Sequence, residues 1–330
     1  MSSSSKEMIL ITQAFNSTAL PFLLDSVTGA KSECRESTVR ADKLLQGASR
    51  APHTRVEVQS VEENDFQAIL HQVHAPEYLD FLREKSEELG EGENLMEHPF
   101  LPEGIDNDTP IVSGIFSQAL ESARTAYCAA GKILHGYRLA YGICRPPGHH
   151  AGRGFLGGYC YLNNTAVAAH TLKAGGKKKV AVLDIDFHFG NGTADLLVDQ
   201  PDLFFCSIHC STDIDYPYVP TCERNDEELY LAFTKKPDEK DYLEAVDKAI
   251  AAIRAFGAEA LVLSVGYDII EEDPHGKWHL SDDIYLEIGK KLQQLDLPIC
   301  LIQEGGYAIE KLDSCAEKLC KGLLAEDTGA

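Results

Sequence analysis

The chain has 330 residues, of which 44% are hydrophobic, and its 30 basic and 52 acidic side chains leave a formal net charge of −22. This length allows a large hydrophobic core, while the acidic balance argues against nucleic-acid binding, which needs a basic face. A cationic substrate, or simply high solubility, fits such a surface better.

The cysteines and the amino terminus indicate a reducing compartment. Ten cysteines occur without a CxxC pair, and several lie in apolar runs (Cys128, Cys144 and Cys300), where buried free thiols are common. The segment Met1–Lys6 is polar and lacks the core of a signal peptide. No stretch reaches the roughly 18 apolar residues of a membrane helix. We therefore expect a cytoplasmic protein without a membrane or nucleic-acid partner.

Hydrophobic periodicity predicts alternating strands and helices along the chain. The expected strands are 8–12, 139–144, a central strand from about 182, 203–209, 260–265 and 298–303. The expected helices are 60–89 with a break at Pro76, 111–136, 163–174, 241–256, 281–295 with Ser281 as N-cap, and one at the C-terminus. Loops with short helices are expected over 13–55, and loops over 86–108 and 211–238.

Repeated β–α units with apolar strands imply an α/β fold. The sheet is expected to be parallel and flanked by helices on both faces. Neither an internal repeat nor a linker is apparent, so 1–330 is interpreted as a single domain.

The stretch Val182–Thr193 contains an unusual alternation of polar and apolar residues. On a strand, Asp184, Asp186 and His188 share one face, and the apolar residues between them point to the other. Two carboxylates and an imidazole are costly to bury unless a metal ion binds them. The alternative is a strand end whose acids face solvent or cap the next helix.

Other polar clusters also follow predicted strands, at 145–150, 267–268 and 304–307. Ligands of parallel α/β sheets bind outside the carboxyl ends of the strands, so these clusters are expected to meet at one edge. Asp268 is then a third metal ligand or a helix cap. His149 and His150 are an acid–base pair or surface or structural residues, and Tyr307 is an oxyanion donor or a packed aromatic.

A GxGxxG pattern at 152–157 does not support a dinucleotide site. That motif must leave a strand and open a helix, whereas here 145–151 separates it from the strand and the following residues are not helical in pattern. The sequence also contains neither a GxSxG elbow nor a P-loop.

In combination, these motifs resemble the zinc-dependent histone deacetylases and the bacterial acetylpolyamine amidohydrolases. The matching segments, over roughly 70–310, are Val73–Leu82, Asp108–Pro110, Arg145–Ala151, Gly157–Asn164, Asp184–His188 with Gly190–Thr193, Gly266–Asp268 with Asp273–Pro274, and Glu304–Tyr307. The resemblance implies the arginase–deacetylase fold and a metal-dependent amidohydrolase activity.

The resemblance also implies roles for individual residues. Zinc, with iron(II) as the alternative, would be held by Asp186, His188 and Asp268. The catalytic set would be His150 as general base and acid, its partner Asn191, His149 oriented by Asp184, and Tyr307 polarising the carbonyl. The substrate would contact Asp108, Gly158, Tyr159 and His275. A structural potassium would lie near Asp184, Asp186, His188, Ser207 and Ile208.

Two residues depart from the family pattern. Phe189 stands where many relatives have a second histidine, and a change of packing rather than of chemistry is expected there. Tyr267 stands where a small or apolar residue or phenylalanine is usual, and it is expected to reshape the site slightly.

The leading function is hydrolysis of N-acetyl amides of cationic amines, most of all acetylpolyamines, with acetyl-lysine in proteins as the alternative substrate. An arginase-like ureohydrolase with two metals and an inactive acetyl-amine binding module are the remaining readings. The residues leave the acyl preference and the oligomeric state open, with a homodimer as one candidate.

Overall fold

The computed structural model describes residues 7–13, 23–24, 31–32, 34–100, 109–197, 199–221, 226–276 and 278–325. Its strands are β1 (Met8–Thr12), β2 (Leu23–Leu24), β3 (Lys31–Ser32), β4 (Thr54–Val58), β5 (Asn94–Leu95), β6 (Ile111–Val112), β7 (Leu139–Gly142), β8 (Val180–Asp184), β9 (Leu203–Cys210), β10 (Glu228–Phe233), β11 (Ala260–Val265) and β12 (Ile299–Gln303). Its helices are α1 (Thr38–Ala48), α2 (Glu63–Val73), α3 (Pro76–Glu88), α4 (Ile115–Leu134), α5 (Asn164–Ala174), α6 (Asn191–Leu197), α7 (Glu239–Phe256), α8 (Ile284–Gln293) and α9 (Leu312–Leu324).

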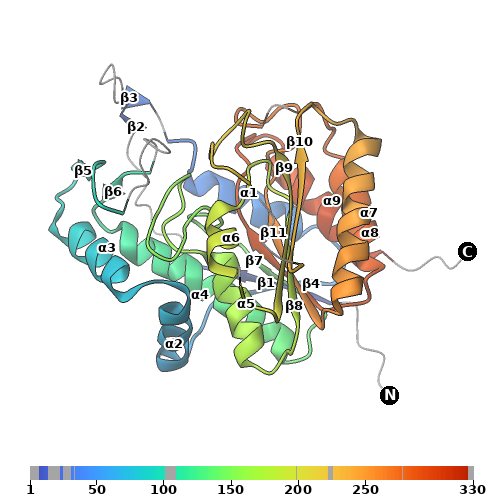
Figure 1. Cartoon of the computed structure of the whole chain (residues 1–330), viewed down its shortest axis with the longest axis horizontal. Helices are drawn as coiled ribbons and strands as arrows, with labels where there is room; N and C mark the ends of the chain where they lie inside the picture. The colour runs from blue at the N-terminus through green and yellow to red at the C-terminus, as the bar shows by residue number, and fades with distance from the viewer. Residues whose placement is uncertain are drawn as a thin grey trace, which may run out of the picture.

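Within the described part of the chain, eight strands form one sheet in the order β10-β9-β8-β11-β12-β7-β1-β4. All of its neighbouring strands run parallel. Every residue of β1, β7, β8, β11 and β12 is buried, as expected for a sheet covered on both faces. Figure 1 shows this sheet nearly edge-on between two layers of helices. The predicted fold class is confirmed.

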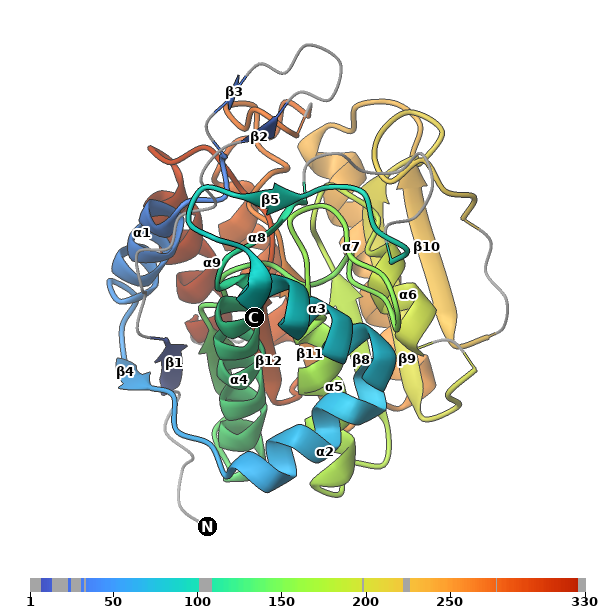
Figure 2. The same cartoon turned by 90° about the vertical axis from the view of Figure 1, so that its left-hand side faces the viewer.

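The alternation of side chains along the strands builds two cores. Met8 and Leu10 of β1 pack in one core with residues of α1, α7, α8 and α9. Ile9 and Ile11 pack in the other core with residues of α2 to α6. Figure 2 shows the layer of α2, α3, α4 and α5 in front of the sheet.

Local sequence signals fix several helix ends. Asn163 caps α5 by accepting a hydrogen bond from the backbone of Ala166, and Asp238 caps α7 in the same way. Gly257 ends α7 with a φ of 76°, a left-handed conformation that favours glycine. Pro76 begins α3, so the predicted break divides the helical region 60–89 into α2 and α3.

Three local expectations were wrong. Strands β4 and β10 lie in regions expected to be irregular, because both are edge strands without continuous burial and carry a weaker apolar pattern. Ser281 does not cap α8: the N-cap is Asp283, and the hydroxyl of Ser281 donates to Glu239 Oε1 instead. The central strand also ends at Asp184, earlier than the alternation had suggested.

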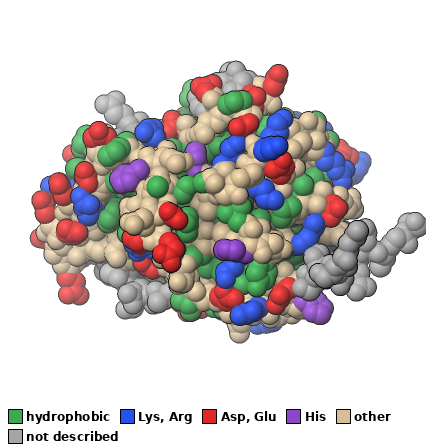
Figure 3. All heavy atoms as spheres, turned by 90° about the horizontal axis from the view of Figure 1, so that it is seen from below, with side chains coloured by type: hydrophobic (Ala, Val, Ile, Leu, Met, Phe, Trp, Pro, Cys, Tyr) green, Lys and Arg blue, Asp and Glu red, His purple; other side chains and the backbone are tan. Residues whose placement is uncertain are grey.

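Acidic and basic side chains are mixed on the surface of the molecule. Figure 3 shows one face on which acidic and basic side chains lie interspersed among other side chains. None of the helices in the described ranges is long and apolar enough to cross a membrane.

Candidate functional site

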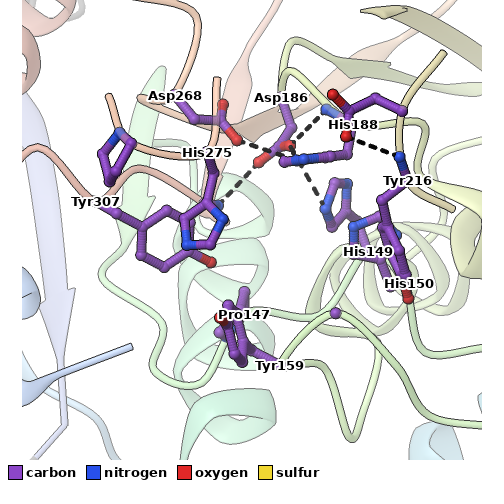
Figure 4. Close-up of a pocket in the computed structure, with 14 residues that line it drawn as sticks. Pro147, His149, His150, Tyr159, Asp186, His188, Tyr216, Asp268, His275 and Tyr307 are labelled. Carbon is purple, nitrogen blue, oxygen red and sulfur yellow. Dashed lines mark hydrogen bonds and ion pairs between the residues drawn. The ribbon is translucent and has the colours of Figure 1, made fainter. Parts of the chain in front are cut away.

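The loops that follow β7, β8, β9, β11 and β12 line one cavity of about 280 Å³. Its walls include the three expected metal ligands together with His149, His150 and Tyr307. Figure 4 shows these side chains converging from separate loops. The polar clusters that follow different strands therefore meet at the carboxyl edge of the sheet, as parallel topology requires.

The candidate metal group consists of Asp186, His188 and Asp268, whose potential ligand atoms all lie within 4.8 Å of one another. His188 Nδ1 lies 3.2 Å from Asp186 Oδ1 and 3.3 Å from Asp268 Oδ2. Backbone amides hold the two carboxylates in place. Phe187 N donates to Asp268 Oδ1 and Gly305 N donates to Asp186 Oδ2, each over 2.9 Å.

These three residues fit a divalent cation. Asp268 Oδ2 is buried without a hydrogen-bond partner among the described residues. Burial and the neighbouring Asp186 carboxylate raise the pKa of Asp268 to about 7, and a cation between the two acids would relieve this cost. A Cβ at Gly305 would lie 2.6 Å from Asp186 Oδ2, so glycine is needed beside the ligands. Carboxylate oxygens and imidazole nitrogens are both ligands that zinc accepts, and a catalytic site holds the ion by three protein ligands.

His149 and Asp184 form a buried pair beside the candidate metal ligands. His149 Nδ1 donates to Asp184 Oδ2 over 2.9 Å, and its Nε2 lies 3.7 Å from Asp186 Oδ1. Burial disfavours the charged imidazole, but Asp186 and Asp184 outweigh this effect and raise the pKa of His149 to about 10. The two carboxylates therefore favour a ring that donates from both nitrogens.

His150 has the opposite electrostatic environment. Its Nδ1 donates to Asn191 Oδ1 over 2.7 Å, which leaves Nε2 as the proton acceptor. Burial and the neighbouring imidazoles of His149 and His188 hold the pKa of His150 well below its usual range. Gly158, at a φ of 54°, lies against this ring, and a Cβ there would come within 2.2 Å of His150 Cδ2.

Tyr307 stands at the opposite wall of the cavity (Figure 4). Asp273 holds its backbone: Oδ2 accepts hydrogen bonds from the amides of Tyr307 (2.6 Å) and Ala308 (3.0 Å). Burial raises the pKa of the Tyr307 phenol well above 10. The hydroxyl therefore keeps its proton and can donate a hydrogen bond.

A buried charged layer beneath Tyr307 was not identified from the sequence. The Arg40 guanidinium lies 4.5 Å from the centroid of the Tyr307 ring and donates to the carbonyls of Glu304 and Gly306. Glu36 accepts from Arg40 Nη1 over 2.9 Å and pairs with Arg145 Nη2 over 3.1 Å. Glu36 and Arg40 lie four residues apart, but no spacing in the chain links them to Arg145 or Tyr307.

Glu304 also has a role that the sequence did not indicate. Its fully buried Oε2 accepts hydrogen bonds from the backbone amides of Gly148 (2.6 Å) and His149 (3.0 Å). Its Oε1 accepts from the hydroxyls of Thr165 (2.8 Å) and Ser264 (3.1 Å). Glu304 thus fixes the loop that carries the two adjacent histidines, and the available signal was an acid directly after a buried strand.

The expected substrate residues are only partly described. Tyr159, with a φ of 65°, lines the cavity, and its ring centroid lies 5.7 Å from that of Tyr307. The His275 ring lies 4.6 Å from the Tyr307 ring, and burial, followed by the charges of His188 and nearby arginines, lowers the pKa of His275 to about 4. Asp108 lies outside the described residues.

Tyr216 was missed because its segment carried no recognised motif. Its ring meets the ring of His150 edge-on at 4.7 Å, and both line the cavity (Figure 4). Of the expected potassium group, Ser207 pairs in register with Asp184 across β9 and β8, and Ile208 is buried in the core.

The two departures from the family pattern lie beside the site. Phe189 is buried and packs its ring 4.7 Å from His209 and 4.9 Å from Tyr230. The Tyr267 hydroxyl lies 3.2 Å from that of Tyr141, and its backbone amide donates to Gly305 O. Neither side chain lines the cavity.

Comparisons with known proteins place this site in context. Residues 34–323 match the histone deacetylase domain. Acetylpolyamine amidohydrolase 1 of Pseudomonas aeruginosa is 36% identical over 230 residues, which cover 66% of this chain and 65% of that protein. An acetylpolyamine amidohydrolase of Burkholderia pseudomallei is 37% identical over 227 residues, covering 67% and 66%. These matches thus span just under two thirds of the relatives' lengths.

A solved structure agrees over more of the chain. The crystal structure of the acetylpolyamine aminohydrolase from Burkholderia pseudomallei superposes with a TM-score of 0.84 and 31% sequence identity. The superposition covers 96% of this chain and 99% of that one.

Proposed function

The chain belongs to the histone deacetylase family, and from this premise we propose that it is a metal-dependent deacetylase that hydrolyses N-acetyl amides of cationic amines. The observation that carries the proposal is the shared cavity. It holds the candidate metal group of Asp186, His188 and Asp268 beside two histidines in contrasting environments and a protonated tyrosine.

The metal would be held by one oxygen of each aspartate and one imidazole nitrogen. When bound, zinc or iron(II) supplies Lewis acidity, which polarises an amide carbonyl and lowers the pKa of water. Asp184 orients His149, whose Nε2 faces Asp186 and can donate a hydrogen bond into the cavity. Other side chains of the protein supply the proton transfer and the hydrogen bond to the carbonyl oxygen.

Proton transfer is assigned to His150. Its low pKa keeps Nε2 unprotonated at neutral pH, and Asn191 fixes the ring, so Nε2 can take a proton from the attacking water. Tyr307 donates a hydrogen bond from its hydroxyl to the carbonyl oxygen as negative charge develops there. His150 then passes this proton to the amide nitrogen as the C–N bond breaks, which releases acetate and the free amine.

We propose acetylated polyamines as the preferred substrates. Two amidohydrolases to which this chain is similar are named for these compounds. The cavity of about 280 Å³ suits a small ligand, and the net charge of −22 would attract a polycation. Acetyl-lysine in proteins remains the second candidate because the matching domain is named for histone deacetylation.

Further proposals concern the domain organisation, the cellular location, a second bound ion and the oligomeric state. We treat 1–330 as one domain, supported by a single large sheet and by a family match over 34–323. A cytoplasmic location is supported by the cysteines of the described part, which form no disulfide with one another. A structural potassium near Asp184, Asp186, His188, Ser207 and Ile208 is supported by the pairing of Asp184 with Ser207. A homodimer stays a candidate.

The decisive experiment combines metal analysis with a substrate panel. The purified protein should contain about one transition metal ion per chain and release acetate from acetylputrescine, acetylcadaverine and acetylspermidine with higher kcat/KM than from an acetyl-lysine peptide. His150→Ala, which removes the proton acceptor but no candidate ligand, should retain the metal and lose the activity.

The alternative functional hypotheses predict different results. Two tightly bound manganese ions and release of urea would identify a ureohydrolase. Binding of acetylated amines without acetate release would identify a binding module, and a higher kcat/KM for the peptide at low salt would identify a protein-lysine deacetylase. Part of the preference for polyamines should fade with rising salt, because exposed charges are screened beyond about 10 Å at about 0.1 M.

A further inference from the structure

Strand β4 forms one open edge of the large sheet. The strand order ends with β4, and within the described ranges β1 is the strand that pairs with it (Figure 2). Its residues Val56 and Val58 are 45% and 66% exposed, which is unusual for the large hydrophobic side chains of this protein. β4 also lacks the proline or lysine with which many edge strands avoid pairing with another chain. This edge therefore has the features of a docking site for a further strand.

The register with β1 determines which backbone groups of β4 point outward. Met8 N donates to His53 O, and Met8 lies opposite Thr54. Because alternate residues of a parallel strand bond to the same neighbour, the odd-numbered residues of β4 bond to β1. The backbone amides and carbonyls that point away from β1 are those of Thr54, Val56 and Val58.

The charges of β4 complement those of a second copy of the same strand. In an antiparallel pair whose two-fold axis passes through Val56, each Arg55 lies directly opposite the second copy's Glu57. Opposite charges in that position stabilise a strand pair, and like charges destabilise it. Within one copy, Arg55 Nη2 lies 3.2 Å from Glu57 Oε1. Two copies would thus place charges of alternating sign on one face of the joined sheet.

The same register also pairs the outward backbone groups. Val56 lies opposite its own copy and Thr54 lies opposite Val58, so the residues whose amides and carbonyls point outward face one another. An antiparallel pair of this length forms about six hydrogen bonds, and it covers part of the exposed valine side chains. The other edge strand, β10, lacks such complementary charges, because Glu228 is its only charged residue.

We propose that β4 is an interface through which two copies of this chain join their sheets in an antiparallel, two-fold arrangement. The interface goes beyond the proposed function and stands independently of it. Contacts through one five-residue strand are smaller than the roughly 1,200 Å² of a stable interface. The dimer should therefore be reversible and form in the micromolar concentration range.

The register predicts how charge changes on β4 affect the dimer. Arg55→Glu leaves two acidic residues on each β4, and Glu57→Arg leaves two basic residues, so each variant repels its own copy. Sedimentation velocity from about 1 to about 200 μM should show a wild-type dimer at the upper end and monomers of both variants. An equal mixture of the two variants places acid opposite base in the same register and should restore the dimer.

Arg83→Glu is the matched control. The Arg83 side chain is 48% exposed on α3, where it pairs with Asp80, so this variant makes the same charge change away from β4 and should keep the wild-type dimer. Glu57 also pairs with Lys132 in its own copy, so circular dichroism should verify that Glu57→Arg is folded. Val56→Lys places two like charges at the two-fold axis without changing that pair, and it should also be monomeric.

Several outcomes would overturn this interface. A wild type that stays monomeric throughout the concentration range would reject self-association and leave the edge to a different partner. A dimer that persists in Val56→Lys and Arg55→Glu would lie on another surface. Folded charge variants that stay monomeric when mixed would reject the two-fold register, and an equal loss of dimer in Arg83→Glu would attribute association to net charge. None of these measurements depends on deacetylase activity, so their failure is distinct from failure of the proposed function.

Discussion

Acid should destabilise this protein through His74, a buried histidine at the end of α2. His74 Nδ1 donates to Gly152 O and its Nε2 accepts the amide of Asn163, each over 2.9 Å. The ring therefore needs one bare nitrogen, and burial lowers the pKa of His74 to about 3. Because the folded pKa lies below the unfolded value of about 6.5, stability is present above pH 6.5 and is lost as the pH falls toward 3.

The size of the effect follows from proton linkage. Each pH unit between the two pKa values changes the free energy of unfolding by about 1.4 kcal/mol per histidine. Between pH 6.5 and 5.0, His74 alone should thus cost about 2 kcal/mol. Urea unfolding followed by circular dichroism at pH 7.5 and 5.0 measures the loss, and His74→Gln should reduce it by about this amount.

His71→Gln provides the control, because His71 is exposed on the same helix three residues earlier. That variant should show the wild-type loss of stability at pH 5.0. If His74→Gln also loses as much stability as the wild type, the buried ring does not couple folding to protons, and the argument from its two hydrogen bonds is wrong.

Four other variants test the site. Asp268→Ala removes one of three candidate ligands and should abolish both activity and bound metal; stoichiometric metal by mass spectrometry would mean that the third ligand is another residue. Tyr307→Phe should retain the metal and lower kcat about 10²-fold or more, whereas near-normal turnover would leave the ring a packing role. Phe189→His should change kcat little and lower the free energy of unfolding by about 1–3 kcal/mol; a large gain in turnover would show a compromised catalyst. Glu304→Ala leaves two buried amides unpaired and should cost about 2–6 kcal/mol in urea unfolding, and an unchanged midpoint would contradict its role in holding the histidine loop.

The alternation of apolar and polar residues in the sequence correctly predicted which side chains are buried in the core and which face the cavity. Leu183, Ile185 and Phe187 all pack in one core, whereas Asp186 and His188 face the cavity, although the strand itself ends at Asp184. The alternation thus continues into the following turn. Backbone hydrogen bonds from Ile185 N to Ser264 O and from Cys210 N to Phe187 O tie this turn to β11 and β9, which maintains the alternation of its side chains.

Residues whose roles depend on distant partners could not be assigned in this way. Glu36, Arg40 and Arg145 form a buried charged layer, yet no periodic pattern connects the first two with Arg145. Charges of this kind are interpretable only when burial and neighbours are known.

The loop after β12 connects the separate parts of the site. Glu304 holds the backbone of the histidine loop, Gly305 N holds Asp186, and Tyr307 enters the cavity two residues later. Arg40 fixes the carbonyls of this loop from below and also covers the Tyr307 ring. The proton-transfer group, the metal group and the carbonyl donor therefore share one short support. A displacement of that loop should change all three together, so variants of Arg40 should lower kcat even though Arg40 does not line the cavity.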